Sequence, residues 1–350
     1  MKRQDEGMPF LLNFENVAWY EDGQVRILDR RIFPMEKKFV YCTDYREIIK
    51  AIQDMVTQSA GPYTAVGMGM ALAAYQCQDL NKEEQIEFLT NASKELGNAR
   101  PTTANRYFAI TERTLAKQLD ALEKGDSAID AAFEDALDSL NRRYATMQKV
   151  GDYLVDQIPD NSSILTQCYG ETIIGAIIRA ARANNKTFKI YNAETRPFMQ
   201  GARLTSSCFQ EAGFDTTVVT DNMINFILEN GDVDFYTSAA DTIAMDGHIA
   251  NKIGTKQIAI LANRVGVPYF VTGIPDQDKK NRDAIKIEYR DPKQVLEFAG
   301  IKTTLDGVKA IYPSFDITSP ELIGAIVTDR GVFSPYSLGD YEKLGGESFY

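Results

Sequence analysis

Residues 163–183 read SILTQCYGETIIGAIIRAARA, a short apolar run that changes at Tyr169-Gly170 into a pattern with helical spacing. Further apolar runs of strand length follow at 188–191, 216–219, 233–236 and 267–271. Strands that alternate with helices predict right-handed βαβ units, and therefore a parallel sheet with helices on both faces. In such a sheet, ligands bind beyond the carboxyl ends of the strands.

The residues before Pro159 follow a different pattern. Three short runs typical of strands occupy 17–20, 25–28 and 39–42, and from Asp44 to about Asp156 the apolar residues are spaced as in helices. Single cores rarely grow beyond roughly 250 to 300 residues, so two are expected here. We therefore expect an α/β protein with two domains. They are a smaller, mostly helical domain with a short antiparallel sheet over 1–158, and a Rossmann-like catalytic domain over 159–350.

The composition excludes several classes of protein. A net charge of −11 argues against a nucleic-acid partner, because phosphate backbones are bound by clustered Lys and Arg. No apolar run reaches the roughly 18 to 20 residues of a membrane span, and the start MKRQDEGMPF is too polar for a signal peptide. We therefore expect a cytoplasmic protein without a membrane partner.

The motifs do not indicate a cofactor or a metal. The pair Gly67-x-Gly69 lacks the third glycine of a dinucleotide fingerprint and lies in a helical pattern. Four cysteines without C-x-x-C spacing and a single histidine, His248, exclude a zinc site built from nitrogen and sulfur ligands. We expect reduced thiols and a structural histidine.

Two residues at predicted strand ends have the chemistry for catalysis. Cys168 closes the apolar run that begins at Ile164, and the dipole of the helix that follows would favour its thiolate. The alternative is a small buried residue. Asp241 ends the segment that begins at Val233, where small and apolar neighbours would raise the pKa of its carboxyl and suit it to a general acid. The alternative is a helix N-cap or loop aspartate.

Three basic residues are candidates for phosphate binding. Residues 246–265 are interpreted as a helix whose N-terminal amides, with the ammonium of Lys252, would bind phosphate. Arg100-Pro101 and Arg196-Pro197 each place a guanidinium beside a proline that fixes the backbone. Each of these residues also has an ordinary interpretation, as a solvated surface charge or a helix-start signal.

Together these segments resemble the methylthioribose-1-phosphate isomerase family, which is related to the ribose-1,5-bisphosphate isomerases and to the regulatory subunits of the translation initiation factor 2B exchange factor. The resemblance covers nearly the whole chain. It is most specific at 193–205 (AETRPFMQGARLT), 220–223 (TDNM), 240–241 (AD) and 250–255 (ANKIGT), with support from 28–31, 100–105 and 311–318.

The resemblance implies an aldose–ketose isomerase that converts S-methyl-5-thioribose 1-phosphate to S-methyl-5-thioribulose 1-phosphate in methionine salvage. It also implies a small sugar phosphate as ligand, no metal or organic cofactor, and a homodimer. Residue by residue, it makes Cys168 the catalytic thiol and Asp241 the catalytic acid. The substrate contacts that it implies are Ser59, Ala60, Gly61, Arg100, Gln200, Asn251 and Lys252.

Several positions depart from the family pattern. Ser59 stands where the phosphate-binding loop has an arginine, Gln167 where a histidine usually precedes the thiol, and Thr242 where an arginine usually follows the acid. The loop after Cys168 is short, as in the ribose-bisphosphate branch. These departures leave open a related substrate, 5-deoxyribose 1-phosphate or ribose 1,5-bisphosphate. A non-catalytic regulatory subunit is a further alternative, although it would have no chemical reason to keep Cys168 and Asp241 together.

Overall fold

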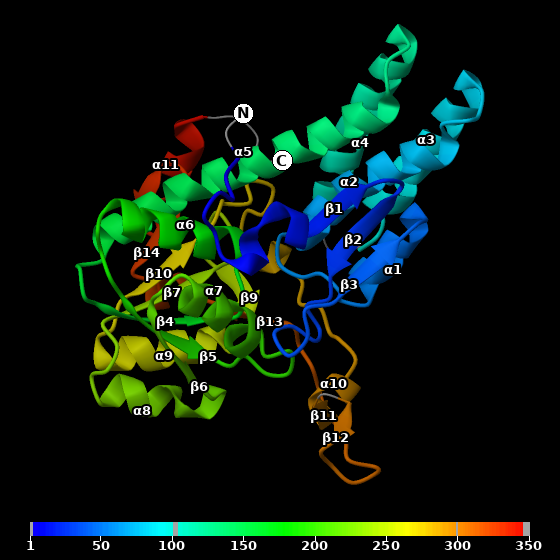
Figure 1. Cartoon of the computed structure of the whole chain (residues 1–350). Coiled ribbons are helices and arrows are strands. Elements are labelled where there is room, and N and C mark those ends of the chain that lie inside the picture. Colours follow the sequence, from blue (N-terminus) through cyan, green and yellow to red (C-terminus); the bar gives the residue numbers. More distant parts are fainter. Residues whose placement is uncertain (1–2, 101–103, 299, 346–350) are drawn as a thin grey trace. The chain divides into compact units, whose positions relative to one another are not determined.

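A computed structural model of the chain describes residues 3–100, 104–298 and 300–345. They form two compact units, one that extends to Ala145 and one that begins at Thr146 (Figure 1). The long helix α5 (Ala128–Gln157) passes from the first unit into the second. The domain boundary expected at 158/159 stays a prediction.

The first unit begins with a small antiparallel sheet. After 3-10 turns at Phe10–Leu12 and Phe14–Asn16, strands β1 (Ala18–Glu21), β2 (Gln24–Leu28) and β3 (Phe39–Cys42) pair in the order β1-β2-β3. Gly23, with a φ of 78°, allows the tight turn between β1 and β2. The three strands predicted for this region are confirmed to within one residue at each end.

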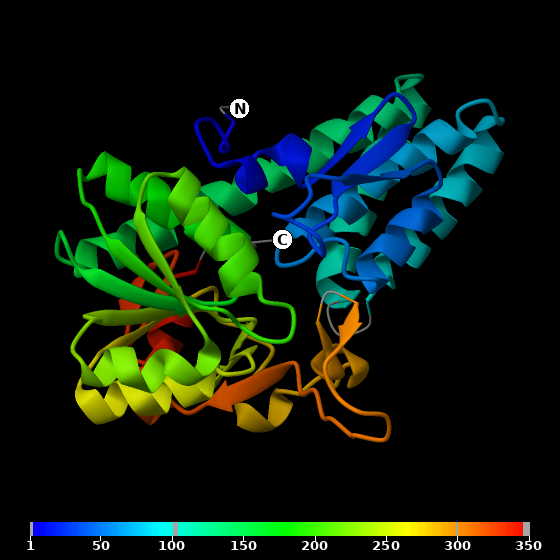
Figure 2. The ribbon, with the colours of Figure 1, turned by 60° about the horizontal axis from the view of Figure 1, so that its bottom comes forward.

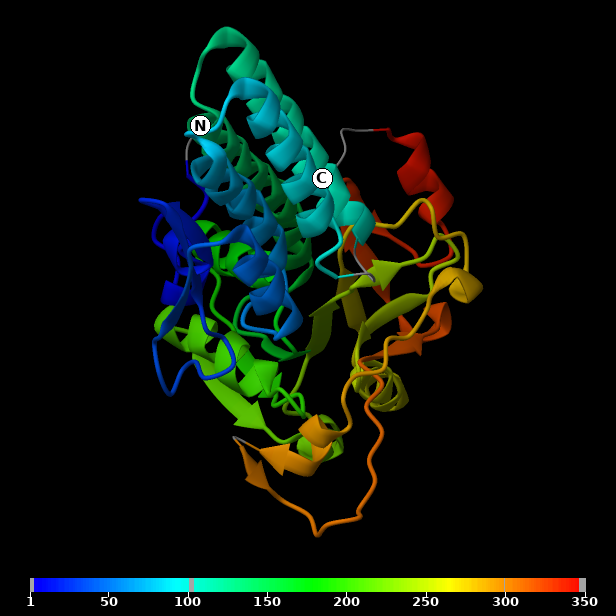
Figure 3. The same cartoon turned by 90° about the vertical axis from the view of Figure 1, so that its right-hand side faces the viewer.

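Helices form the rest of the first unit, as predicted. Besides α5, these helices are α1 (Tyr45–Gln53), α2 (Gly61–Cys77), α3 (Lys82–Gly97) and α4 (Ala104–Lys124). Capping boxes start α1, at Asp44 and Glu47, and α3, at Asn81 and Glu84. Helix α2 is apolar on all its faces, so it packs against α1, α3, α4 and β1 alike (Figure 3).

The second unit is built on a seven-stranded sheet in the order β15-β14-β10-β7-β4-β5-β6. Its strands are β4 (Ser163–Gln167), β5 (Lys189–Ala193), β6 (Asp215–Val219), β7 (Phe235–Ala239), β10 (Tyr269–Thr272), β14 (Ala325–Thr328) and β15 (Gly331–Phe333). Every pair is parallel except β14 with β15. The predicted parallel sheet is confirmed, and β14 and β15 extend it beyond the strands recognised in the sequence.

The order of the strands places a topological switch point between β4 and β7. Strands β5 and β6 follow β4 on one side, and the chain then returns to place β7, β10 and β14 on the other. Figure 2 shows α8 (Ile224–Glu229) and α9 (Thr255–Val265) on one face of the sheet, and α6 (Glu171–Ala183) and α7 (Ser206–Glu211) on the other. A crevice at the carboxyl ends of β4 and β7 is where such a sheet binds its ligand.

A three-stranded sheet beside this edge corrects one prediction. It consists of β8 (Thr242–Ile243), β9 (Ile249–Lys252) and β13 (Phe315–Thr318), in the order β13-β9-β8. The helix predicted over 246–265 is therefore wrong in its first part, because residues 246–248 form a turn and residues 249–252 form strand β9. The cause is local: Gly247 and Gly254 have φ values of 86° and 102°, which a helix does not accommodate.

Short elements complete the second unit. They are α10 (Lys293–Leu296), β11 (Glu297–Phe298), β12 (Ile301–Lys302), α11 (Leu338–Lys343), the π-helical turn Gly201–Thr205, and 3-10 turns at Asp221–Met223, Arg282–Ala284 and Pro320–Leu322. Within residues 3–100, 104–298 and 300–345, no helix combines the length and apolar character needed to cross a membrane.

Candidate active site

Cys168 lies at the switch point, directly after β4. Its φ of 57° is unusual for a residue with a side chain, and two threonines hold it in this conformation. The Cys168 amide donates to Thr195 Oγ1 at 2.9 Å, and the Thr205 hydroxyl donates to the Cys168 carbonyl. The thiol is partly buried, whereas Cys42, Cys77 and Cys208 are buried. The loop from Thr195 to Thr205 therefore fixes the backbone that presents this thiol.

Asp241 follows β7, the strand next to β4, and so lies on the same edge of the sheet. Its amide donates to the Ala250 carbonyl at 3.0 Å, which aligns Asp241 with β9 and brings it close to Asn251. The predicted dry surroundings are not found, because Asp241 is exposed. The reason is that the hairpin of β8 and β9 begins here and carries the chain out of the sheet.

Asn251 and Lys252 end strand β9 and are both buried. Asn251 Nδ2 donates to Ser238 Oγ at 3.2 Å and to Thr255 Oγ1 at 3.0 Å, so its amide group connects β7, β9 and α9. The Lys252 ammonium lies 4.7 Å from the centre of the Phe315 ring. The structure thus places Asn251 in an internal network and Lys252 as a cation beside an aromatic face.

Three charged groups interact with the Cys168 thiol. Burial is the largest effect and raises the pKa of Cys168 above its ordinary value; Lys252 lowers this pKa, Asp241 raises it and Arg290 lowers it. The net shift is upward, because burial outweighs the positive charges that act on the sulfur. Lys252, Asp241 and Arg290 must nevertheless lie close enough to the sulfur for their charges to act on it. Arg290 was not among the predicted site residues.

The N-terminus of α9 is not the phosphate site that the sequence suggested. Its amides at Gly254 and Lys256 donate to the Asp316 carboxylate at 2.8 and 3.1 Å. A carboxylate on the helix cap satisfies these donors and would repel a phosphate. Burial raises the pKa of Asp316 to about 6, while the two amides act in the opposite direction.

Gln200 lies in the loop that holds Cys168. Its side chain is buried, and its Oε1 has no hydrogen-bond partner among the described residues. A Cβ atom on the next residue, Gly201, would overlap with the Ala193 carbonyl of β5, so only glycine lets this loop approach the sheet. A buried acceptor without a donor is costly unless a ligand supplies one, which fits the substrate contact predicted for Gln200.

The loop 59–61 and Arg100 belong to the first unit. Ser59, with a φ of 59°, is exposed, and a Cβ at Gly61 would overlap with Thr57 Oγ1, so the turn into α2 requires a glycine. Arg143 Nη1 donates to the Ala60 carbonyl at 3.4 Å. A buried arginine, not recognised in the sequence, thus supports a loop that has no cation of its own.

Arg100 lies just before α4, and Pro101, Thr102 and Thr103 fall outside the described residues. The first turns of α2 and α4 are adjacent, because the Tyr63 and Tyr107 rings lie 5.4 Å apart and Arg106 Nη1 donates to the Tyr63 hydroxyl at 3.4 Å. The structure therefore brings the loop 59–61 and Arg100 to one end of the helical bundle. Separately, it brings Cys168, Asp241, Gln200, Asn251 and Lys252 to one edge of the sheet.

Two other candidates have structural roles. His248 Nδ1 lies 3.0 Å from Asp246 Oδ2 in the turn between β8 and β9, as expected of a structural histidine. Arg196 donates to the carbonyls of Pro197 and Val295, at 3.0 and 3.3 Å. In the described part of the chain, no group of three or more His, Cys, Asp or Glu side chains is arranged to hold a metal.

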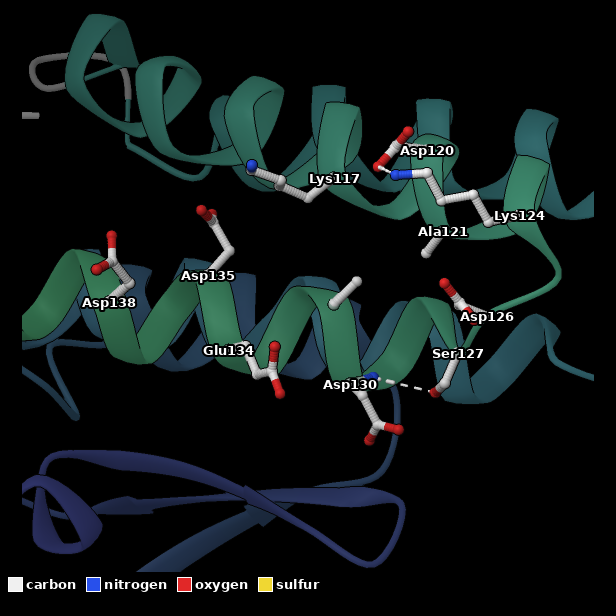
Figure 4. A pocket seen from close by; sticks show the side chains of 11 residues that line it. Lys117, Asp120, Ala121, Lys124, Asp126, Ser127, Asp130, Glu134, Asp135 and Asp138 are labelled. Atoms are coloured by element: carbon white, nitrogen blue, oxygen red, sulfur yellow. Dashed lines mark hydrogen bonds and ion pairs between the residues drawn. The ribbon is translucent and has the colours of Figure 1, made fainter. Parts of the chain in front are cut away.

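A hollow of about 570 Å³ lies between α4 and α5 in the first unit, where side chains of the two helices face each other (Figure 4). It contains none of the predicted site residues. Asp135 is held there by Arg113 and Thr114. Carboxylates outnumber lysines in its lining, which disfavours a phosphate ligand. The lining consists of Lys117, Asp120, Ala121, Lys124, Asp126, Ser127, Asp130, Ala131, Glu134, Asp135 and Asp138.

Comparison with known proteins identifies the family. Residues 60–335 match the model of the initiation factor 2 subunit family. The chain belongs to this family. One relative is a protein from Pseudothermotoga lettingae named methylthioribose-1-phosphate isomerase 1, which is 33% identical over 349 residues that cover 96% of this chain and 100% of that protein. The family resemblance recognised in the sequence is thereby confirmed.

Solved structures of the initiation factor 2 subunit family confirm the fold class. The 5-methylthioribose 1-phosphate isomerase from Pyrococcus horikoshii superposes with a TM-score of 0.81 and 28% identity, covering 95% of this chain and 97% of that one. The delta subunit of translation initiation factor eIF-2B from A. fulgidus also gives 0.81, with 27% identity and coverage of 94% and 98%. The fold is thus shared by proteins named as an enzyme and as an initiation factor, so residues of the site must distinguish the two.

Proposed function

We propose that the chain is an aldose–ketose isomerase that converts S-methyl-5-thioribose 1-phosphate to S-methyl-5-thioribulose 1-phosphate, a step of methionine salvage, with Cys168 and Asp241 as its catalytic pair. The names of close relatives support the reaction class. The observation that carries the assignment of the pair is the position of Cys168, in a left-handed conformation at the switch point, within the electrostatic reach of Asp241 and Lys252. A regulatory subunit would have no use for a thiol held in this way.

The substrate sets the chemical problem. Its anomeric oxygen carries the phosphate, so the sugar ring cannot open by itself and the enzyme must break the bond between C1 and O4. Asp241 donates a proton to O4 as the C1–O4 bond breaks, while the Cys168 thiolate removes the proton from C2 and the electrons of the C2–H bond form a C1–C2 double bond.

The second half of the reaction returns Asp241 and Cys168 to their starting protonation states. The Asp241 carboxylate takes the proton of the C2 hydroxyl, the ketone forms at C2, and C1 takes the proton from the Cys168 thiol. No atom is gained or lost, as an isomerisation requires. A transfer of hydride from C2 to C1 during ring opening is the other route, and incorporation of deuterium at C1 from D₂O separates the two, because only the proton route exchanges with solvent.

The positive charges near the sulfur have a role in the proton route. Burial raises the pKa of Cys168, whereas Lys252 and Arg290 lower it, so both cations act to increase the fraction of thiolate. A buried thiolate is also a stronger base toward carbon than a solvated one, because water does not stabilise it.

The test is to follow the conversion of methylthioribose 1-phosphate by proton NMR with the wild type, Cys168→Ser and Cys208→Ser. Cys208 is a buried cysteine of the same unit and serves as the matched control. We expect turnover to fall by about a thousandfold or more in Cys168→Ser, and to persist in Cys208→Ser. An active Cys168→Ser variant would disprove the catalytic role of this thiol.

The substrate is tested in parallel with 5-deoxyribose 1-phosphate and ribose 1,5-bisphosphate. Faster turnover of either compound, abolished by Cys168→Ser, would keep the catalytic pair and reject the methylthioribose assignment. No turnover of any of the three by folded protein would favour a regulatory subunit. A homodimer and a cytoplasmic location are part of the same proposal, and light scattering of the purified protein tests the dimer.

A further inference from the structure

Arg290 is a largely buried cation beside the segment that leads into β13, and its charge acts on the Cys168 thiol. Its side chain is 9% exposed, and its Nε donates to Glu288 Oε1 at 3.1 Å. Its Nη1 is buried and has no hydrogen-bond partner among the described residues. A buried N–H group without an acceptor destabilises a fold, so its retention suggests that a ligand supplies the acceptor.

The backbone holds Arg290 in a defined place. Its amide donates to the Tyr312 carbonyl at 2.9 Å, and the Ser314 amide donates to the Glu288 carbonyl at 2.8 Å, so residues 288–290 pair antiparallel with 312–314. The segment 312–314 leads directly into β13, whose Phe315 is paired with Lys252 of β9. Arg290 is thus positioned by strand pairing, which is more rigid than a surface loop.

Arg290 and Lys252 lie against the same aromatic ring. The Arg290 guanidinium carbon is 5.9 Å from the centre of the Phe315 ring, and the Lys252 ammonium is 4.7 Å from it. The hydroxyl of Tyr312, the direct cross-strand neighbour of Arg290, is also buried and interacts with the Arg290 side chain. Two cations therefore lie against one aromatic ring with a tyrosine hydroxyl beside one of them, an arrangement that suits an oxyanion.

We propose that Arg290 binds the phosphate group of the substrate through its unpartnered Nη1, beside Lys252 and the Tyr312 hydroxyl. Glu288 occupies Nε and orients the planar guanidinium, so that its outer edge faces the ligand. The loop 59–61 has no charged side chain, which leaves a phosphate in need of cations from elsewhere. The proposal rests on the proposed function for the identity of the sugar, but not for the binding of a phosphate.

The first experiment uses inorganic phosphate and does not require turnover. The rate at which iodoacetamide alkylates Cys168 is measured by peptide mass spectrometry, over a range of phosphate concentrations at constant ionic strength. Because Lys252 and Arg290 favour the Cys168 thiolate, an anion bound to them reduces its reactivity and slows alkylation. The concentration for half protection then reports phosphate binding.

The variants are Arg290→Gln, Arg290→Lys and Arg264→Gln, the last an exposed arginine of α9 in the same unit as a matched control. We expect the half-protection concentration to rise about tenfold or more in Arg290→Gln, to rise less in Arg290→Lys, which keeps the charge without the fork, and to be unchanged in Arg264→Gln. The proposal is overturned if phosphate does not slow alkylation of the wild type, or if Arg290→Gln is protected at the same concentration. If Arg290→Gln does not fold, Arg290→Lys is used instead, and a half-protection concentration equal to that of the wild type overturns the proposal.

Turnover supplies a second readout. With methylthioribose 1-phosphate, Arg290→Gln should raise KM by about tenfold or more and lower kcat by less, because the contact is present in the bound substrate. A merely structural arginine would instead lower the melting temperature and kcat without changing the phosphate concentration for half protection. Lack of turnover by the wild type would reject the substrate of the proposed function, while the alkylation experiment would still decide the role of Arg290.

Discussion

Asp316 is predicted to make the protein less stable as pH rises from acid to neutral. Its carboxylate is buried at the N-terminus of α9, and burial raises its pKa from 3.8 to about 6. Between these two values, Asp316 is protonated in the folded chain and ionised in the unfolded chain, so folding takes up a proton. The contribution of this group to stability is therefore complete below about pH 4 and is lost as pH rises through about 6.

The size of the effect follows from the shift in pKa. A difference of about two units corresponds to about 3 kcal/mol between the two limits of pH. The substitution Asp316→Asn removes the titration and keeps one carbonyl oxygen as an acceptor for the amides of Gly254 and Lys256. The loss of the second acceptor has a cost of about 1 kcal/mol that does not depend on pH. At pH 7 the stability of Asp316→Asn should therefore be closer to that of the wild type than it is at pH 4, or should exceed it.

The assay is urea unfolding of the wild type and Asp316→Asn at a series of pH values from 4 to 8. The difference in the free energy of unfolding, wild type minus variant, should fall by about 2.4 kcal/mol over this range, because all other titrating groups are common to both proteins. A difference that stays constant, or that rises with pH, would refute the reasoning, since it would mean that the amides of α9 stabilise the carboxylate more than burial destabilises it.

Three further predictions concern Cys168 and its support. The alkylation rate of Cys168, measured by peptide mass spectrometry, should rise with pH through a midpoint above that of a free cysteine, because burial raises the pKa of this thiol; a midpoint at or below that of a free cysteine would contradict this. Thr195→Val leaves the Cys168 amide without its acceptor, so we expect a loss of about 1 to 3 kcal/mol in urea unfolding together with a lower kcat. Gly201→Ala forces a Cβ onto the Ala193 carbonyl and should cost about 3 kcal/mol, whereas the control Gly339→Ala, whose Cβ meets no neighbour, should cost nothing.

The sequence predicted the main sheet because most of its strands are largely buried, and read as apolar runs with helices between them. Strands β4, β5 and β6 begin and end within two residues of the apolar runs from which they were predicted. The carboxyl ends of β4 and β7, and with them Cys168 and Asp241, follow from the same pattern. Such a sheet leaves few alternatives, since each strand must be apolar and each connection right-handed.

The region 246–256 was misread because its side chains resemble those of a helix start. Polar residues followed by an apolar, regularly spaced segment are typical of a helix N-terminus, but Gly247 and Gly254 turn the backbone and β13 pairs with the intervening strand. That partner comes from residue 315 onward, far along the chain. Asp316 lies on β13 as well, and its carboxylate accepts from the amides of Gly254 and Lys256, which the sequence had suggested as phosphate donors. The sequence could not show this contact.

Arg290 could not be recognised from the sequence, because no local motif marks it and its neighbours in space are known only from the fold. Its neighbours in sequence, Tyr289 and Asp291, are those of an ordinary loop, and nothing in the spacing distinguishes it from the other arginines of the chain. Its importance arises from two pairings: that of residues 288–290 with 312–314, and that of β13 with β9, which together carry the guanidinium to Lys252. A charge gains a function from its burial and from the charges around it, and both are properties of tertiary structure.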